Sequence, residues 1–273
     1  MKLSMNEATA LKCKGTTLEQ DLALCEKYGY DMIEIRTMDC LKNYFAVHSI
    51  DELAEYFATH PVKPWAFNTL EYFNNLPDDD YKETLRKLRE MCEWGKKIGC
   101  KTVITVPTVG LKKVTRQAIR KSTLECLKEM GEICGEADMR LSVEFLGHPE
   151  ASINDFGEAY DIIQELDMEN VGLTLDCFHF HGMHSSLADL AQADGKKIFI
   201  VHLKTRRTSS TAPCAMTTAS GRVMAASTST ASCRRSRRSA GHRTSCRSSS
   251  SARSTTRCRQ MTSTASARQR AKP

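Results

Sequence analysis

The last 69 residues of this 273-residue chain lack eight residue types entirely. From Thr205 to Pro273 there is no Asp, Glu, Asn, Leu, Ile, Phe, Tyr or Trp. Without acids or large apolar side chains this stretch cannot bury a hydrophobic core, so we predict a disordered tail rich in Arg, Ser and Thr. It carries 15 of the 39 Lys and Arg residues, which leaves residues 1–204 with 24 basic and 33 acidic residues and a net charge of −9. The overall charge of +6 therefore describes neither part.

Residues 1–204 lack several features that would indicate other classes of protein. No apolar run approaches the length of about 18 residues that a membrane-spanning helix needs. No signal peptide precedes the first strand-like segment. The chain has 12 cysteines but no CxxC pair, and four cysteines fall in helical patterns, where they behave as small apolar residues: Cys25, Cys92, Cys126 and Cys134. We expect a cytoplasmic protein with reduced thiols and no membrane association.

Short apolar runs alternate with longer stretches of helical periodicity through residues 1–204, which predicts a series of β/α units. The predicted strands are Lys2–Met5, Met32–Arg36, Trp65–Thr69, Thr102–Val106, Leu141–Phe145, Val171–Asp176 and Ile198–Leu203. The predicted helices are Leu18–Tyr28, Asp51–Thr59, Tyr81–Ile98, Arg116–Glu136, Phe156–Leu166 and Leu187–Ala191.

These units fit either a doubly wound open sheet or a closed barrel. The strand at 102–106 is apolar almost throughout, as expected for a parallel sheet that is covered on both faces. A dinucleotide-binding sheet has a glycine-rich turn after its first strand, and residues 6–10 contain no glycine. We predict an α/β fold, a (β/α)8 TIM barrel with about seven strands that lacks its last βα unit. Because such a barrel has two unpaired edges, we expect it to stay open.

Polar residues stand at the C-terminal ends of the predicted strands, where TIM barrels carry their chemistry. In chain order these are Glu34 and Arg36, Asn68, Glu144, Asp176 and His202. The last three lie in consecutive apolar strands, where an unpaired charge is costly. A shared metal accounts for all three, whereas either carboxylate alone fits a structural ion pair equally well. Two carboxylates and an imidazole suit Mn²⁺, Zn²⁺ or Co²⁺ better than Mg²⁺.

Two further residues are candidates for contacting a substrate. His179 follows the sixth predicted strand, and we expect it to point back toward the metal, whereas the nearby His181 and His184 fit ordinary loop histidines. Glu150 lies six residues beyond Glu144 in a βα loop. Its carboxylate could reach the mouth of the barrel or remain solvated.

Several strings in residues 1–204 carry a family resemblance. They are Met1-Lys2-Leu3, Asn6-Glu7-Ala8-Thr9, YDMIEIRTMD from Tyr30, GHPEASIN from Gly147, DCFHFHGM from Asp176 and ADGKKIFI from Ala193. Together they resemble the inosose isomerases of inositol catabolism, within the xylose isomerase-like TIM barrel superfamily, from Met1 to about Lys204. The resemblance implies a metal-dependent isomerase that converts 2-keto-myo-inositol to 1-keto-D-chiro-inositol through an enediolate.

The resemblance also implies a ligand set of Glu, Asp, His and a second Glu. The first three correspond to Glu144, Asp176 and His202, and Glu144 would also act as a catalytic acid and base. His179 and Lys204 would position hydroxyls of the substrate, a cyclic polyol ketone. The fourth ligand belongs to a Val-Ser-Val-Glu-Leu-Phe strand, which this chain does not contain.

The genetic code offers a second interpretation of the tail. One allowed spelling of residues 244–252, read one base earlier, gives Val-Val-Ser-Val-Glu-Leu-Phe-Arg, and residues 228–239 likewise permit an amphipathic helix. We therefore interpret residues 205–273 as the enzyme's ending read out of frame, with a frameshift after Lys204. The Glu codon straddles Ser248 and Ser249, so neither can be the ligand. We expect weak metal affinity, little or no activity and poor solubility.

Three alternatives stay open. Another ketose epimerase or isomerase of the superfamily would share the metal site but prefer other sugars. A zinc-dependent DNA-repair endonuclease would need more histidine ligands and a basic groove, whereas residues 1–204 have a net charge of −9. A basic-tailed nucleic-acid-binding protein would contact phosphates without specificity, since the tail has no aromatic residue for stacking bases. We expect no specific nucleic-acid partner, and the sequence does not determine the oligomeric state.

Overall fold

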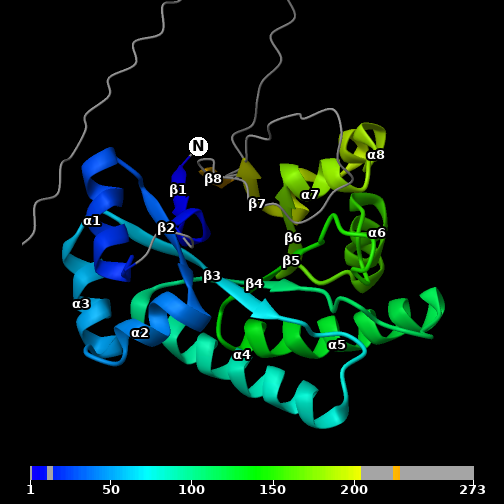
Figure 1. The fold of residues 1–273 in the computed structure, drawn as a ribbon, viewed down its shortest axis with the longest axis horizontal. Helices are drawn as coiled ribbons and strands as arrows, with labels where there is room; N and C mark the ends of the chain where they lie inside the picture. Colours follow the sequence, from blue (N-terminus) through cyan, green and yellow to red (C-terminus); the bar gives the residue numbers. More distant parts are fainter. Residues whose placement is uncertain (1, 11–14, 204–223, 228–273) are drawn as a thin grey trace, which may run out of the picture. The chain divides into compact units, whose positions relative to one another are not determined.

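Eight strands form a closed sheet in the order β1 to β8 (Figure 1). The computed structural model describes residues 2–10, 15–203 and 224–227, the last of these by the backbone alone. The strands are β1 (Leu3–Asn6), β2 (Met32–Arg36), β3 (Lys63–Glu71), β4 (Thr102–Val106), β5 (Arg140–Glu144), β6 (Val171–Asp176), β7 (Ile198–Leu203) and β8 (Met224–Ser227). Strands β1 to β7 pair in parallel with their neighbours. The predicted TIM-barrel class and its seven parallel strands are confirmed.

The closing strand β8 corrects the expectation of an open barrel. It pairs antiparallel with both edges, opposing Met224 to Leu203 of β7 and Ala226 to Leu3 of β1. The exposed edges of β1 and β7 carry unpaired backbone N–H and C=O groups, which an extended segment of either direction can satisfy. The short antiparallel strand β8 thus occupies the place of the eighth parallel strand of a complete barrel. It lies beyond Lys204, where the sequence analysis ended the barrel. Lys204 and the rest of the predicted tail, residues 205–223 and 228–273, lie outside the described residues.

The helices connect successive strands and cover the outer side of the sheet (Figure 1). They are α1 (Leu18–Tyr28), α2 (Lys42–Tyr44), α3 (Ile50–Thr59), α4 (Asp78–Ile98), α5 (Arg116–Glu136), α6 (Phe156–Leu166), α7 (Cys177–Gly182) and α8 (Leu187–Gln192), with the turns η1 (Glu7–Ala10), η2 (Thr37–Leu41) and η3 (Gly195–Lys197). All six predicted helices are present. The prediction missed the short elements α2 and α7 and the turns, whose sequences show no helical periodicity.

Local sequence signals explain where the long helices begin and end. Ser49 and Glu52 form a capping box at the start of α3, with Ser49 Oγ accepting the Glu52 N–H at 3.2 Å. Gly29 and Gly99 end α1 and α4 with φ angles of 70° and 80°, in the left-handed region that glycine adopts at little cost.

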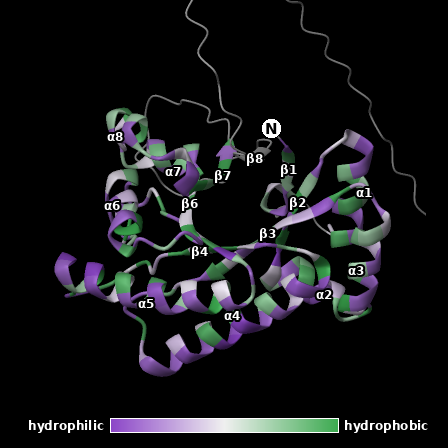
Figure 2. Cartoon of the chain, turned by 180° about the vertical axis from the view of Figure 1, so that it is seen from behind, coloured by the Kyte–Doolittle hydropathy of each residue, from purple (hydrophilic) through white to green (hydrophobic). Residues whose placement is uncertain are grey.

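The hydrophobic core lies between the sheet and its helices. Figure 2 shows the corresponding pattern, with polar residues concentrated on the outer helix faces. Cys25, Cys92 and Cys134 are buried in this core and Cys126 is half-buried, as their helical positions predict. A smaller cluster joins residues of β3, β4 and β7, strands on different sides of the barrel, and so fills the barrel interior. None of the described helices is long and apolar enough to cross a membrane.

Candidate metal centre

Three neighbouring strands bring two carboxylates and an imidazole together at their C-terminal ends. Glu144 ends β5, Asp176 ends β6, and His202 of β7 lies opposite Asp176 in the strand register. The exposed fractions of the three residues are 6%, 0% and 1%. Each offers one ligand atom, and these atoms all lie within 4.8 Å of one another. The strand-end rule thus places the three predicted ligands in one cluster.

The imidazole of His202 lies between two sets of carboxylates. Its Nδ1 is 3.1 Å from Glu144 Oε1 and 3.7 Å from Asp176 Oδ2. Its Nε2 is 3.0 Å from both carboxylate oxygens of Glu34. Burial opposes the charged imidazolium, but the negative charges of Glu34 and Glu144 outweigh it and hold the pKa of His202 well above its ordinary value. In the metal-free protein His202 is therefore a buried cation among carboxylates.

This donor set fits a divalent metal ion. The Nδ1 side of His202 faces Glu144 and Asp176, so an ion that replaces the imidazole proton would find one nitrogen and two carboxylate ligands there. Such a mixed set suits Zn²⁺, Mn²⁺ or Co²⁺. The closing strand β8 brings no further carboxylate or imidazole, because its four residues are Met, Ala, Ala and Ser. The cluster therefore offers three protein ligands within the described residues.

Glu34 completes this cluster from the far side of the imidazole. It is fully buried in the middle of β2, and its Oε2 accepts hydrogen bonds from Asn6 Nδ2 at 3.0 Å and Asn68 Nδ2 at 3.2 Å. Two amide donors thus fix the carboxylate that faces His202 Nε2. A carboxylate on the second imidazole nitrogen sets the ring orientation and makes the first nitrogen a better ligand. The sequence places Glu34 and Asn68 at strand ends but does not reveal their link to His202.

We expect Glu34→Gln to lower the zinc affinity of this cluster by about tenfold, because the amide removes the charge that orients and polarises His202. Zinc titration of the chelator-treated chain against a competing fluorescent indicator measures the change. Glu71→Gln is the matched control, since Glu71 is an exposed carboxylate at the end of β3. Equal zinc affinities for Glu34→Gln and the parent chain would contradict this role.

Asp176 faces the imidazole of His202 and is also the N-cap residue of α7. Its Oδ1 accepts the N–H of Phe178 at 2.7 Å and so caps the start of α7. His179 is half-buried on this helix, so the segment after β6 is helical where the sequence suggested a loop. His181 lies exposed on the same helix, and its ring centroid is 6.0 Å from that of His184, which follows the helix. Asp176 thereby connects the metal cluster to the helix that carries His179.

The other two predicted substrate contacts are not brought to the cluster by the described structure. Glu150 is exposed in the loop between β5 and α6, where its N–H donates to His148 Nδ1 at 3.2 Å and its carbonyl accepts the N–H of Gly110 at 2.9 Å. Lys204 lies outside the described residues. The proposed roles of His179, Glu150 and Lys204 in binding substrate stay predictions.

Comparison with known proteins agrees with this fold. The family model for xylose isomerase-like TIM barrels matches residues 22–219. Inosose isomerases from Bacillus licheniformis and Bacillus velezensis are 48% and 47% identical over 203 residues, which cover 74% of this chain and 72% of each relative. A crystal structure of the IOLI protein with a bound zinc atom is 44% identical with a TM-score of 0.72, covering 76% of this chain and 74% of that one. The chain therefore belongs to the xylose isomerase-like TIM barrel family.

Proposed function

We propose that this chain is an isomerase of keto-inositols that depends on a divalent metal and converts 2-keto-myo-inositol to 1-keto-D-chiro-inositol. The observation that carries the proposal is the buried cluster of Glu144, Asp176 and His202. It occurs in a chain that is 43–48% identical to four inosose isomerases. The proposed substrate is a cyclic polyol ketone, and the reaction is an intramolecular oxidation and reduction without a redox cofactor.

Glu144, Asp176 and His202 would hold the metal. When bound, a divalent ion polarises a ketone and its neighbouring hydroxyl and makes the intervening C–H more acidic. The zinc atom in the IOLI structure favours Zn²⁺ over Mn²⁺ and Co²⁺ for this site. Glu34 keeps His202 aligned for this task through its contact with Nε2.

Glu144 would move the proton between the two carbons. Its carboxylate takes the proton from the hydroxyl-bearing carbon, which gives an enediolate, and returns it to the former carbonyl carbon. The hydroxyl proton passes to the other oxygen, so atoms and electrons balance within the substrate. Burial of Glu144 in the cluster excludes water that would compete for the proton. His179, Glu150 and Lys204 are proposed to bind substrate hydroxyls.

We further propose that the chain as written is impaired. The expected fourth ligand is absent, and the acid and base pair keeps only Glu144, as the frameshift interpretation predicts for residues 205–273. Three ligands bind a metal more weakly than four, and a single carboxylate must serve both carbons. The cytoplasmic location, the poor solubility and the absence of a specific nucleic-acid partner stay predictions.

A substrate panel tests the proposed function. The chain, and a version with the reading frame restored after Lys204, are incubated with 2-keto-myo-inositol, D-fructose and D-psicose, each with and without added Zn²⁺, Mn²⁺ or Co²⁺. We expect metal-dependent conversion of the keto-inositol, faster in the restored version, and little conversion of the ketohexoses. Preference for a ketohexose would overturn the substrate, and undiminished turnover after chelation would overturn the role of the metal. Equal turnover by the two versions would overturn the impairment.

A further inference from the structure

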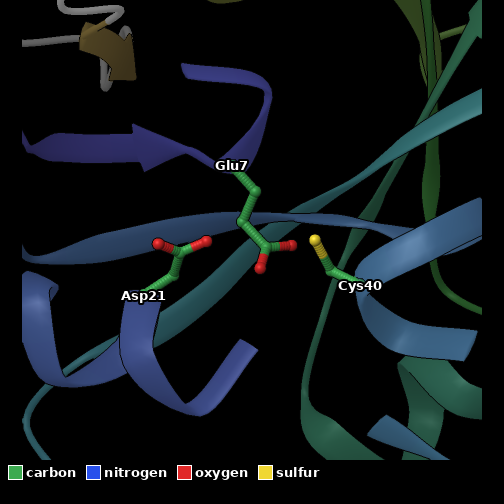
Figure 3. Close-up of side chains that lie close together, drawn as sticks. All are labelled: Glu7, Asp21 and Cys40. Atoms are coloured by element: carbon green, nitrogen blue, oxygen red, sulfur yellow. The ribbon is translucent and has the colours of Figure 1, made fainter. Parts of the chain in front are cut away.

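A second cluster of metal-binding side chains lies among the first two βα units. It consists of Glu7 on η1, Asp21 on α1 and Cys40 on η2. Their ligand atoms lie within 4.8 Å of one another. Figure 3 shows the Glu7 carboxylate between the Asp21 carboxylate and the Cys40 sulfur, so the three side chains point toward one another. The cluster thus joins two elements between β1 and β2 to the turn that follows β2.

The carboxylates of this cluster are buried without enough partners. Asp21 is 0% exposed and Glu7 is 1% exposed. Within the described part of the chain, no backbone N–H or basic side chain donates to either oxygen of Asp21 or to Oε1 of Glu7. Their side-chain hydrogen bonds are to one another and, for Glu7, to the Cys40 thiol. Glu7 Oε2 accepts the N–H of Arg36 at 2.6 Å. A buried acceptor without a partner is costly, and a second carboxylate beside it adds repulsion.

No basic side chain of residues 2–10 and 15–203 neutralises the pair. The nearby guanidinium of Arg36 is bound to both oxygens of Asp39 through its Nε, at 3.0 Å each. Burial raises the pKa of Glu7 to about 8 and the pKa of Asp21 to about 6, and it also raises the pKa of the Cys40 thiol. A cavity of about 80 Å³ adjoins the three side chains, with Thr16, Asp39 and Asn43 in its wall. The cluster therefore has both the room and the electrostatic need for a cation.

We propose that Glu7, Asp21 and Cys40 bind a Zn²⁺ ion at a site separate from the Glu144 cluster. A thiolate with two carboxylates suits Zn²⁺, whereas Ca²⁺ and Mg²⁺ prefer all-oxygen ligands. The ion satisfies the free carboxylate oxygens and replaces the proton of the thiol. The adjoining cavity leaves space for water as a further ligand.

The position of this site assigns it a structural role. The ion links η1, α1 and η2, which flank β1 and β2. Glu7 directly follows Asn6, the residue that donates to Glu34, and Glu7 also accepts the N–H of Arg36 at the end of β2. A metal here holds the end of β1, which carries Asn6, against the end of β2, two residues beyond Glu34. We expect zinc to raise the melting temperature of the chelator-treated chain through this link.

Cobalt substitution tests the site directly, because a thiolate bound to Co²⁺ gives a near-ultraviolet charge-transfer band that carboxylates and imidazoles do not give. Co²⁺ is added to the chelator-treated full chain and to Cys40→Ser, Cys126→Ser and Glu144→Gln. Cys126 is the matched control, since it is a half-buried thiol on α5, and Glu144→Gln weakens metal binding at the other cluster. We expect the band in the parent chain, Cys126→Ser and Glu144→Gln, and its loss in Cys40→Ser. Asp21→Asn keeps the thiol, and we expect it to bind Co²⁺ at least about tenfold more weakly.

Two outcomes would overturn the proposal. One is the absence of a thiolate band from the parent chain at saturating Co²⁺. The other is a band that survives in Cys40→Ser, which would place the thiolate elsewhere among the 12 cysteines of the chain. Circular dichroism of Cys40→Ser confirms that it is folded, and a retained Co²⁺ affinity in Asp21→Asn would remove Asp21 from the site.

Discussion

Glu144→Gln is expected to lower keto-inositol turnover by about 10²–10⁴-fold, the range for loss of a general acid and base. Gln has nearly the same shape as Glu and keeps an oxygen for the metal, so the fold of β5 should not change. It cannot accept a proton from carbon, and it removes one of the two negative charges that face His202 Nδ1. Weaker zinc binding should therefore accompany the loss of turnover.

The two effects of Glu144→Gln are separated by measuring turnover at saturating zinc, in the version with the restored reading frame, where we expect the higher activity. Glu169→Gln is the control, because Glu169 is exposed and lies before β6, at the opposite end of the barrel from the cluster. If Glu144→Gln at saturating zinc turned over substrate at the rate of Glu169→Gln, Glu144 would not be the proton carrier.

Gly147→Ala is expected to destabilise the protein and to weaken metal binding in the same step. A Cβ at Gly147 would lie 2.1 Å from the carbonyl oxygen of His179 and 2.6 Å from its Cα, far inside van der Waals contact. These are backbone atoms of α7, which cannot turn aside as a flexible side chain can. A Cβ at Gly182, at the end of α7, would lie 2.5 Å from the carbonyl oxygen of Gly147, so the helix and the loop meet at two glycines.

The added methyl group of Gly147→Ala forces α7 away from the β5–α6 loop, at a cost of about 1–3 kcal/mol in the free energy of unfolding. Because Asp176 caps α7, movement of this helix also displaces a metal ligand. Urea unfolding and zinc titration measure the two effects. Gly195→Ala is the control, since a Cβ there meets no atom within 4 Å. Parental stability and zinc affinity in Gly147→Ala would show that α7 and the loop are not rigidly packed.

The regular fold was predictable because each long element carries its own signal. Apolar runs place β2, β4, β6 and β7 at their observed residues, and helical periodicity does the same for α1, α5 and α6. Strand β3 was predicted too short at both ends, since Lys63, Pro64 and Glu71 are not typical residues of a buried strand. The short helix α7 was missed because its residues, Cys-Phe-His-Phe-His-Gly, alternate apolar and polar side chains and do not follow a helical period.

The closing strand could not be predicted, because its four residues carry no strand pattern that distinguishes them from the rest of the tail. Their pairing depends on the unsatisfied edges of β1 and β7, and these edges exist only after the other seven strands have formed. Tertiary context, and not local propensity, decides such a segment.

The candidate site was predictable only in part. The strand-end rule finds Glu144, Asp176 and His202, because parallel strands place their C-terminal ends on one side of the barrel. It does not find the contact between Glu34 and His202, which are 168 residues apart and lie on strands that are not neighbours. The cluster of Glu7, Asp21 and Cys40 was missed for a similar reason, since its members come from a turn, a helix and a second turn.

An anomalous difference map from crystals of the zinc-loaded chain, collected at the zinc absorption edge, tests the metal centre most directly. We predict a peak bounded by Glu144, Asp176 and His202 Nδ1, with Glu34 still in contact with Nε2. This metal centre is contradicted if zinc is bound to the protein but no peak lies among these three residues, or if the zinc is bound by Nε2 in place of Nδ1.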